Sequence, residues 1–440
     1  MPRWKPALWG TGQVAVQVYR DLPSLLLLFY MTQLLEIDPA LAGIAIFIPK
    51  LFWSTTCDFI VGTLSDRYRH RVARRWLLLV GAVLAPIALI GLFLPPSGTP
   101  MEKAVHVGLA FAAYVTVFSI FSVPHLSIGA ELTAIREEQS SVMGWRTTFI
   151  AVGVLMGAGF APWLIQRFGN GFEAYHTMTY VMSAVCSLAL ILSFFGAREA
   201  RYVHSTLDKS SKWQALKRNR PYRYLLGAWC AQMTGQGAAY ATLTYLVVFK
   251  LAFPDPFVAL SISVIFTCSA QILMQPLLVR MTNRFGSRLT FMGGSVVYSG
   301  ALAWMGLGPE GSLINFWAAS VALGATNAIT WQSSAARLSE MIAEDADAHD
   351  GESHAGFYSS LFVMGEKIAF AIGGTLIAGM LLSLSGFEAG KDSQSSSAIW
   401  GIALIFALMP ATFNALAIFL MSRSRHLEPA LRGDTAPQTV

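Results

Sequence analysis

Runs of about 20 apolar residues recur along the chain, from its first dozen residues almost to its C-terminal end, and short polar breaks separate them. A helix of this length can span a bilayer, because it satisfies its own backbone hydrogen bonds inside the hydrocarbon core. Hydrophobic residues make up 54% of the 440 residues and charged residues only 13%. That charged share is about half of the share in soluble proteins. The pattern predicts an all-α membrane protein without a sizeable soluble domain.

Charge clusters and Gly or Pro groups divide the chain into twelve expected transmembrane helices. We expect these helices at about 8–35, 39–64, 77–95, 105–130, 145–168, 174–196, 223–250, 257–281, 289–308, 312–338, 355–386 and 397–421. The longest expected loop is basic and lies near the middle of the chain. It suggests an N-terminal six-helix bundle (1–197), a cytoplasmic linker (198–222) and a C-terminal six-helix bundle (223–425), followed by a disordered polar tail (426–440).

The basic residues indicate the orientation of these helices, because Lys and Arg in short loops stay on the cytoplasmic side. They gather on one side of the expected bundle, at Arg3 and Lys5 and in the ranges 67–75, 209–223, 280–288 and 423–425. Both termini are therefore expected in the cytoplasm, and the protein in the inner (plasma) membrane. The first apolar stretch has no small-residue cleavage site after it, so we expect a retained helix. Topology also accounts for the net charge of +6, and no nucleic-acid partner is expected.

The sequence gives little support to an enzyme. Its four cysteines lie in apolar segments without the spacing of metal ligands, so we expect no disulfide framework, metal site or cofactor. A lipid-modifying enzyme would need a clustered nucleophile and base, or a His/Asp metal set, at membrane depth. Neither pattern is present, which makes an intramembrane enzyme the weaker alternative.

The segment Gly62-Thr-Leu-Ser-Asp66-Arg67-Tyr-Arg69-His-Arg71 follows the second expected helix. It resembles the loop signature of the major facilitator superfamily, and the segment from Arg280 to Arg288 echoes it weakly. The resemblance implies two parallel, pseudo-symmetric six-helix halves that rock about a central site. It also implies a gate latch that involves Asp66, Arg67, Arg71 and Glu131.

A narrower resemblance covers most of the chain. It is carried by Phe29-Tyr-Met-Thr32, by Trp53-Ser-Thr-Thr-Cys-Asp58, by Pro124-His125 through Glu131 to Gly144-Trp-Arg146, and by Gly356-Phe-Tyr358 through Lys367. In order and spacing, these stretches are similar to the glycoside-pentoside-hexuronide cation symporters, the melibiose-permease-like family. The resemblance implies cation-coupled import of a small solute by alternating access. The expected partners are the solute, a coupling H⁺ or Na⁺ and the lipid bilayer, and the expected state is a monomer.

The family's sodium site is incomplete in this sequence. In the family, the second helix carries two carboxylates one turn apart, but here the first is Ser54 and only Asp58 is kept. A further acid in the fourth helix is Ser122. A single carboxylate offers sodium a weak field but suits a proton, because burial favours its neutral form. We expect cation coupling through Asp58, Ser54 and Glu366, with a proton favoured over sodium; alternatively, Asp58 only pairs with a basic residue.

Ionisable groups at the centre of a membrane helix cost at least about 2.5 to 3.5 kcal/mol and persist where they face a partner or water. In this chain they are Arg20, Asp21, Lys50, Asp58, Arg146, Glu366 and Lys367. Lys367 occupies the family's lysine position in the eleventh helix, which implies a contact with Asp58. Arg20 and Asp21 have no family counterpart. They point about 100° apart on a helix, so we expect separate partners for them. Arg20 either anchors a carboxylate or phosphate, or pairs with Asp58 or Glu366.

The expected substrate is a small polar or amphipathic solute. Gln17 stands where melibiose permease carries a sugar-binding Asp, which argues against a galactoside. The residues expected to bind the substrate are Gln17, Arg20, Asp21, Ser122, His125, Arg146, Trp331 and Lys367. For each polar residue alone, hydrogen bonding between helices is an equal explanation. The alternatives within transport are a lysolipid or another anionic amphipathic substrate, uniport and export.

Overall fold

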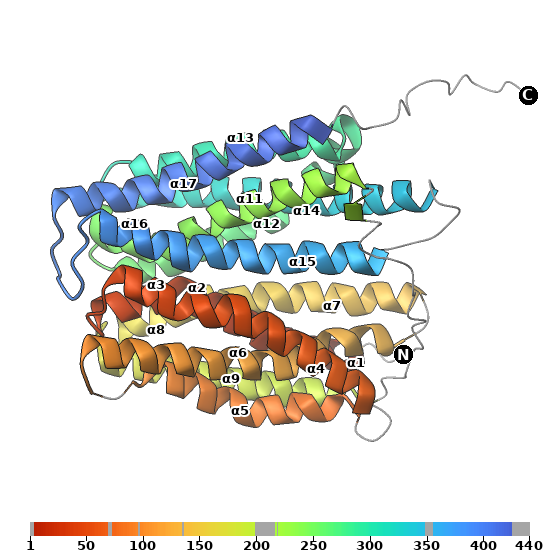
Figure 1. Ribbon diagram of the computed structural model, residues 1–440, viewed down its shortest axis with the longest axis horizontal. Coiled ribbons are helices and arrows are strands. Elements are labelled where there is room, and N and C mark those ends of the chain that lie inside the picture. The colour runs from red at the N-terminus through yellow and green to blue at the C-terminus, as the bar shows by residue number, and fades with distance from the viewer. Residues whose placement is uncertain are drawn as a thin grey trace, which may run out of the picture.

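The structure is a computed structural model that describes residues 4–68, 73–95, 97–133, 136–198, 216–217, 219–347 and 355–424. These residues are almost entirely helical (Figure 1). Arg71, most of the expected linker and the expected disordered tail lie outside the described residues, and so does the side chain of Asp66.

Six helical segments form the N-terminal half. They are α1–α2 (Trp4–Gly10, Gly12–Gln33), α3–η1–α4 (Pro39–Ile48, Pro49–Trp53, Ser54–Tyr68), α5 (Arg75–Phe93), α6 (Pro100–Glu131), α7–η2–α8 (Arg136–Val154, Leu155–Phe160, Ala161–Arg167) and α9 (Phe172–Gly196). The C-terminal half has α11–η3 (Arg220–Tyr245, Leu246–Lys250), α12 (Pro256–Phe285), α13 (Ser287–Leu307), α14 (Leu313–Asp347), α15–η4–α16 (Ala355–Ala371, Ile372–Ile377, Ala378–Leu384) and α17 (Ser396–Arg423).

Within the described ranges, ten of these segments are long and apolar enough to cross a membrane. The other two, α11–η3 and α13, are of comparable length but carry more polar side chains, among them Gln232 and Gln236 on α11 and Ser295 and Ser299 on α13. Together the twelve segments correspond to the twelve expected helices, and the expected all-α fold is confirmed.

Three boundaries differ clearly from the expectation, and local chemistry explains the one at α6. The start of α7 lies at Arg136 and not near 145. α6 begins at Pro100 and not near 105, because Thr99 and Glu102 form a capping box and Pro100 occupies the first turn. α14 runs on to Asp347, well past the expected end near 338. Its last turns are too polar to read as part of a membrane span.

The helices of each half lie together, with α1–α9 in the lower part of Figure 1 and α11–α17 in the upper part. The N-terminus and the C-terminal end of α17 lie at the same end of the bundle, called here the terminal end; the opposite one is the far end. The domain limits 1–197 and 223–425 stay predictions.

The fifth and eleventh spans share an unusual pattern, which reflects the relation between the halves. Each begins as an α-helix, passes through a six-residue π-helical segment, and ends in a seven-residue α-helix. The π segments are rich in glycine, with Gly157 and Gly159 in η2 and Gly373 and Gly374 in η4. Single-turn π segments are rare and often mark functional positions.

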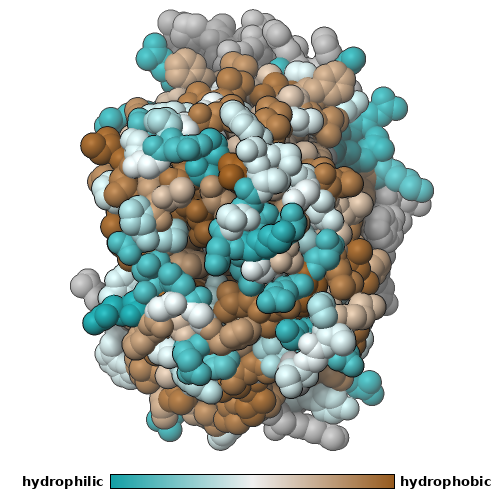
Figure 2. Space-filling view, turned by 90° about the vertical axis from the view of Figure 1, so that its left-hand side faces the viewer, coloured by the Kyte–Doolittle hydropathy of each residue, from teal (hydrophilic) through white to brown (hydrophobic). Residues whose placement is uncertain are grey.

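The two halves are sealed together at the far end. α3 and α16 cross so closely that a Cβ atom on Gly43 would lie 2.4 Å from the carbonyl oxygen of Thr375, and one on Gly379 would lie 2.5 Å from that of Pro39. Beside this crossing, the hydroxyls of Thr32 and Tyr245 lie 2.7 Å apart. Figure 2 looks onto the far end and shows hydrophilic side chains gathered over its middle.

Candidate functional site

An ion pair joins the two halves near the middle of the bundle. Lys367 on α15 donates from Nζ to Asp58 Oδ2 on α4 over 2.7 Å. The side chain of Lys367 is 50% exposed and that of Asp58 is 22% exposed. Charged groups at this depth are stable only beside a partner or water. Each member of this pair has the other as its partner, and Lys367 stays half exposed. The contact is the one that the family resemblance implied.

The hydroxyl beside Asp58 is not one that the sequence singled out. Ser119 on α6 donates to Asp58 Oδ1 over 2.6 Å. Among the described residues, neither Ser54 nor Ser122 makes a hydrogen bond to Asp58. Ser119 lies one turn of α6 before Ser122, and which of the two reaches Asp58 depends on the depth at which α4 and α6 cross.

Arg20 and Asp21 contact each other, so the expectation of separate partners was wrong. Arg20 Nε lies 3.2 Å from Asp21 Oδ1, and Gln17 donates from Nε2 to Asp21 Oδ2 over 2.7 Å. The Arg side chain is long enough to fold back along the helix, which outweighs the divergent Cβ directions of adjacent residues. Asp21 is buried, whereas the side chain of Arg20 remains 54% exposed.

Lys50 and Glu366 lie close to this pair. Lys50, in the π segment η1, has its Nζ 3.4 Å from the hydroxyl of Ser24 and 5.5 Å from the ring centre of Phe370. It is within electrostatic reach of both Arg20 and Asp21. Glu366, half-buried on α15, interacts electrostatically with Arg20 and Lys367. Lys50 was not among the expected site residues, although it was one of the ionisable groups expected at membrane depth.

Three other expected substrate residues have contacts between helices. His125 is 1% exposed, stacks on Trp9 with ring centres 4.7 Å apart, and has Nε2 3.1 Å from the Trp9 carbonyl oxygen. It therefore fixes α1 against α6 and does not face the solvent. Arg146 donates to Gln13 Oε1 over 3.3 Å, and Trp331 packs edge-on against Trp229. A polar residue in an apolar run indicates a special environment but not the direction in which the side chain points.

Of the expected latch at the terminal end, the structure describes the side chains of Arg67 and Glu131. Glu131 pairs with Arg74, which caps α5 and also donates from Nε to the hydroxyl of Ser65 over 3.1 Å. Arg67 is exposed and lies over the ring of Tyr68. The stretch 67–75 contains several arginines that could pair with Glu131. Among the described ones, Arg74 makes this pair from the start of α5.

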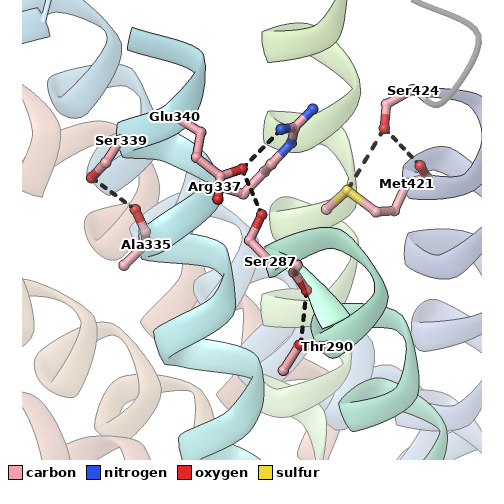
Figure 3. Close-up of polar contacts among 9 residues, drawn as sticks. Ser287, Thr290, Ala335, Arg337, Ser339, Glu340, Met421 and Ser424 are labelled. Carbon is pink, nitrogen blue, oxygen red and sulfur yellow. Dashed lines mark hydrogen bonds and ion pairs between the residues drawn. The ribbon is translucent and has the colours of Figure 1, made fainter. Parts of the chain in front are cut away.

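A cluster similar to that of Arg74 and Glu131 lies at the terminal end of the C-terminal half, where the sequence did not predict one. Arg337 donates to Glu340 Oε2 over 2.8 Å, and the hydroxyl of Ser287 donates to the same oxygen over 2.7 Å (Figure 3). Arg337 is buried. A serine, an arginine and a glutamate thus connect the fourth helix of each half to the start of its third helix. The available signal was an arginine and a glutamate three residues apart on a helix.

Two six-helix halves, sealed at one end and joined at mid-depth by an ion pair, define a major facilitator transporter. The chain belongs to the family described as MFS/sugar transport protein, whose sequence profile matches residues 8–425. This confirms the resemblance to the superfamily and agrees with the melibiose-permease-like family. The protein is therefore a transporter and not an enzyme.

Relatives of known sequence cover nearly the whole chain. An uncharacterized symporter, YjmB of Bacillus subtilis (strain 168), is 25% identical over 94% of this chain and 90% of its own length. A putative 2,3-dihydroxypropane-1-sulfonate exporter of Salmonella typhimurium is 24% identical over 96% of this chain and 92% of its own length.

Solved structures share the fold at low identity. The nucleoside transporter NupG superposes with a TM-score of 0.68 at 14% identity, over 96% of this chain and 99% of that one. A bacterial homologue of the human lysosomal transporter Spinster, in an inward-facing and occupied conformation, superposes with a TM-score of 0.71 at 11% identity, over 96% of both chains.

Proposed function

We propose that the protein is a secondary active transporter that imports a small polar solute by alternating access, coupled to a proton. The observation that carries this proposal is the Asp58–Lys367 ion pair between the halves. Protonation of Asp58 removes the charge that holds Lys367. The halves then separate at this point and close elsewhere, which exposes the site to the other side of the membrane.

The surroundings of Asp58 favour a proton over sodium. Hard cations prefer several oxygen ligands. Asp58 has one hydroxyl neighbour, Ser119, and an ammonium group already occupies its second oxygen. Sodium would have to displace Lys367 and recruit further ligands, whereas a proton needs one carboxylate oxygen.

We place the terminal end in the cytoplasm and the protein, as a monomer, in the inner membrane. The basic residues at this end support the orientation, among them Arg74, Arg284 and Arg423. With this orientation, the far-end seal faces the outside, and the structure is closed on the external side.

Reconstituted liposomes test the proposal. Uptake of radiolabelled galactosides, hexuronates and hydroxylated sulfonates would be measured under an inward proton gradient or an inward sodium gradient. We expect uptake of at least one solute to follow the proton gradient without sodium, and Asp58→Asn to abolish accumulation. The matched control Thr63→Ala changes a hydroxyl on the same helix, one that donates to the Phe59 carbonyl of that helix, and should keep accumulation. Accumulation that follows sodium alone, or that survives in Asp58→Asn, contradicts proton coupling through Asp58.

Export is the second candidate function. It is supported by the relatives named as putative 2,3-dihydroxypropane-1-sulfonate exporters, in Salmonella typhimurium and in Escherichia coli K12. Cells that express the protein distinguish the two directions, because an exporter lowers the retention of preloaded solute and an importer raises its accumulation.

A further inference from the structure

We infer that Arg20, Lys50 and Tyr240 form a binding site for the anionic group of the solute, so that the substrate is a small hydroxylated organic acid with a carboxylate or sulfonate. This inference rests on the proposed transport function. It concerns the class of substrate and does not depend on which cation is coupled.

The guanidinium of Arg20 is only partly used within the protein. Its Nε contacts Asp21, and among the described residues its two terminal nitrogens have no hydrogen-bond partner. These two nitrogens form a planar fork that matches two oxygens of a carboxylate, sulfonate or phosphate. Asp21, held in turn by Gln17, holds the Nε edge of the guanidinium, and the side chain of Arg20 remains 54% exposed.

Lys50 supplies a second cation without a carboxylate partner. In the described part of the chain, its ammonium group contacts only the hydroxyl of Ser24 and the ring of Phe370. Arg20 and Lys50 repel each other, being within electrostatic reach. An anion between them removes this repulsion and gives Lys50 its missing partner.

Tyr240 and Phe370 provide the other sides of the site. Their ring centres are 6.0 Å apart, and Tyr240 interacts electrostatically with Arg20 and Asp21. The Tyr240 hydroxyl has no hydrogen-bond partner in the residues that the structure describes, so it is free to bind an oxygen of the solute. Helices from both halves therefore meet at this point: α2 and η1 from one, α11 and α15 from the other.

The charges around the site also fit an anion that travels with a proton. Three cations, Arg20, Lys50 and Lys367, face three carboxylates, Asp21, Asp58 and Glu366. A bound anion adds one negative charge to this balanced set. One proton on Asp58 or Glu366 restores the balance, so the loaded site moves without a net charge in a low-dielectric surrounding.

Binding to the full-length protein in detergent tests this site. Calorimetry would compare 2,3-dihydroxypropane-1-sulfonate and glycerate with their neutral counterpart glycerol, and with lysophosphatidylcholine as the lipid arm. We expect at least one of the two small acids to bind and glycerol not to bind. In Arg20→Gln and Lys50→Gln, the dissociation constant should rise at least about tenfold. Lys391→Gln, which removes a cation at an exposed pair with Glu388, should bind like the wild type.

Two further variants keep the result interpretable. Arg20→Lys retains the charge but loses the fork, and should bind the acids more weakly than the wild type. This variant takes the place of Arg20→Gln as the test if Arg20→Gln does not fold. Asp58→Asn should still bind them, so a failure of proton coupling is separable from a failure of the anion site. Binding of glycerol equal to that of the acids, binding of the lysolipid alone, no binding of either acid, or unchanged affinity in both Arg20→Gln and Lys50→Gln overturns the inference.

Discussion

Lys367 and Asp58 stand on different halves of the protein and meet over 2.7 Å, while Ser119 holds the second oxygen of the same carboxylate. The two partners are unequally exposed, and the lysine is the more accessible of the two. A lysine on a long flexible stem can leave the carboxylate while its ammonium group stays hydrated. Asp58 is held from its own half by Ser119. We therefore expect Lys367, and not Asp58, to move when the pair breaks.

Lys367→Gln should uncouple transport without blocking it. Glutamine is one atom shorter than lysine and uncharged, so it offers Asp58 no cation from which protonation could release it. We expect the ratio of accumulated solute at equilibrium under a proton gradient to fall to nearly one, while solute exchange without a gradient continues. Parallel accumulation and exchange assays in liposomes check this. Accumulation equal to that of the wild type contradicts a coupling role for Lys367.

The far-end seal should not tolerate a side chain. In Gly379→Val, the new side-chain atoms would collide with the carbonyl oxygen of Pro39. This oxygen belongs to the backbone and cannot move away by a change of rotamer. We expect the protein to favour a far-end-open arrangement and its uptake rate to fall at least about tenfold. Gly293→Ala is the control, because a Cβ there meets nothing within 4 Å. Labelling of a cysteine introduced at Thr32 reports the opening, and equal labelling in both variants argues against it.

Arg74, and not Arg67, should stabilise the terminal end of the N-terminal half. Arg74→Ala removes a cation that pairs with Glu131 in a largely buried place, and we expect a loss of about 3 kcal/mol in the free energy of unfolding. Arg67→Ala removes an exposed cation over an aromatic ring and should cost no more than about 1 kcal/mol. Denaturation of both variants in detergent gives the comparison. An equal loss in both contradicts the assignment.

Ser287→Ala probes the corresponding cluster of the C-terminal half. The substitution removes one hydrogen bond to Glu340, which Arg337 still holds, and we expect a loss of about 1 kcal/mol. Ser339→Ala serves as the control, because the exposed Ser339 hydroxyl only donates to the carbonyl of Ala335 on its own helix. A larger loss in Ser339→Ala than in Ser287→Ala would count against this role.

His125→Phe separates structure from substrate binding. Phenylalanine preserves the stacking on Trp9 but removes the contact with the Trp9 carbonyl oxygen. We expect about 1 kcal/mol of lost stability and an unchanged substrate affinity. Thermal unfolding and solute binding, measured on the same preparation, check both parts, and a large fall in affinity at native stability contradicts a purely structural role.

The fold could be predicted from the sequence because membrane helices follow from local composition. The sequence predicts α11–η3 and α13 as membrane helices despite their polar side chains, because loops and charge clusters mark the ends of both segments. The Asp58–Lys367 contact followed from family resemblance alone. No local pattern links two residues 309 positions apart.

The rest of the candidate site depends on packing that the sequence does not encode locally. The contact of Ser119 with Asp58 depends on the depth at which α4 and α6 cross. The burial of His125 depends on α1 folding back over α6. The pairing of Arg20 with Asp21 depends on a rotamer, which helix geometry alone does not determine.

The crossing of Gly43 and Gly379 has a consequence for how the carrier prevents leaks. The closest surfaces at this crossing are backbone atoms, so no side-chain rotamer lies between Gly43 and Gly379. Thermal motion of single side chains therefore cannot open a passage there. Only displacement of α3 and α16 as whole helices breaks the barrier, which makes access from that side an all-or-none event.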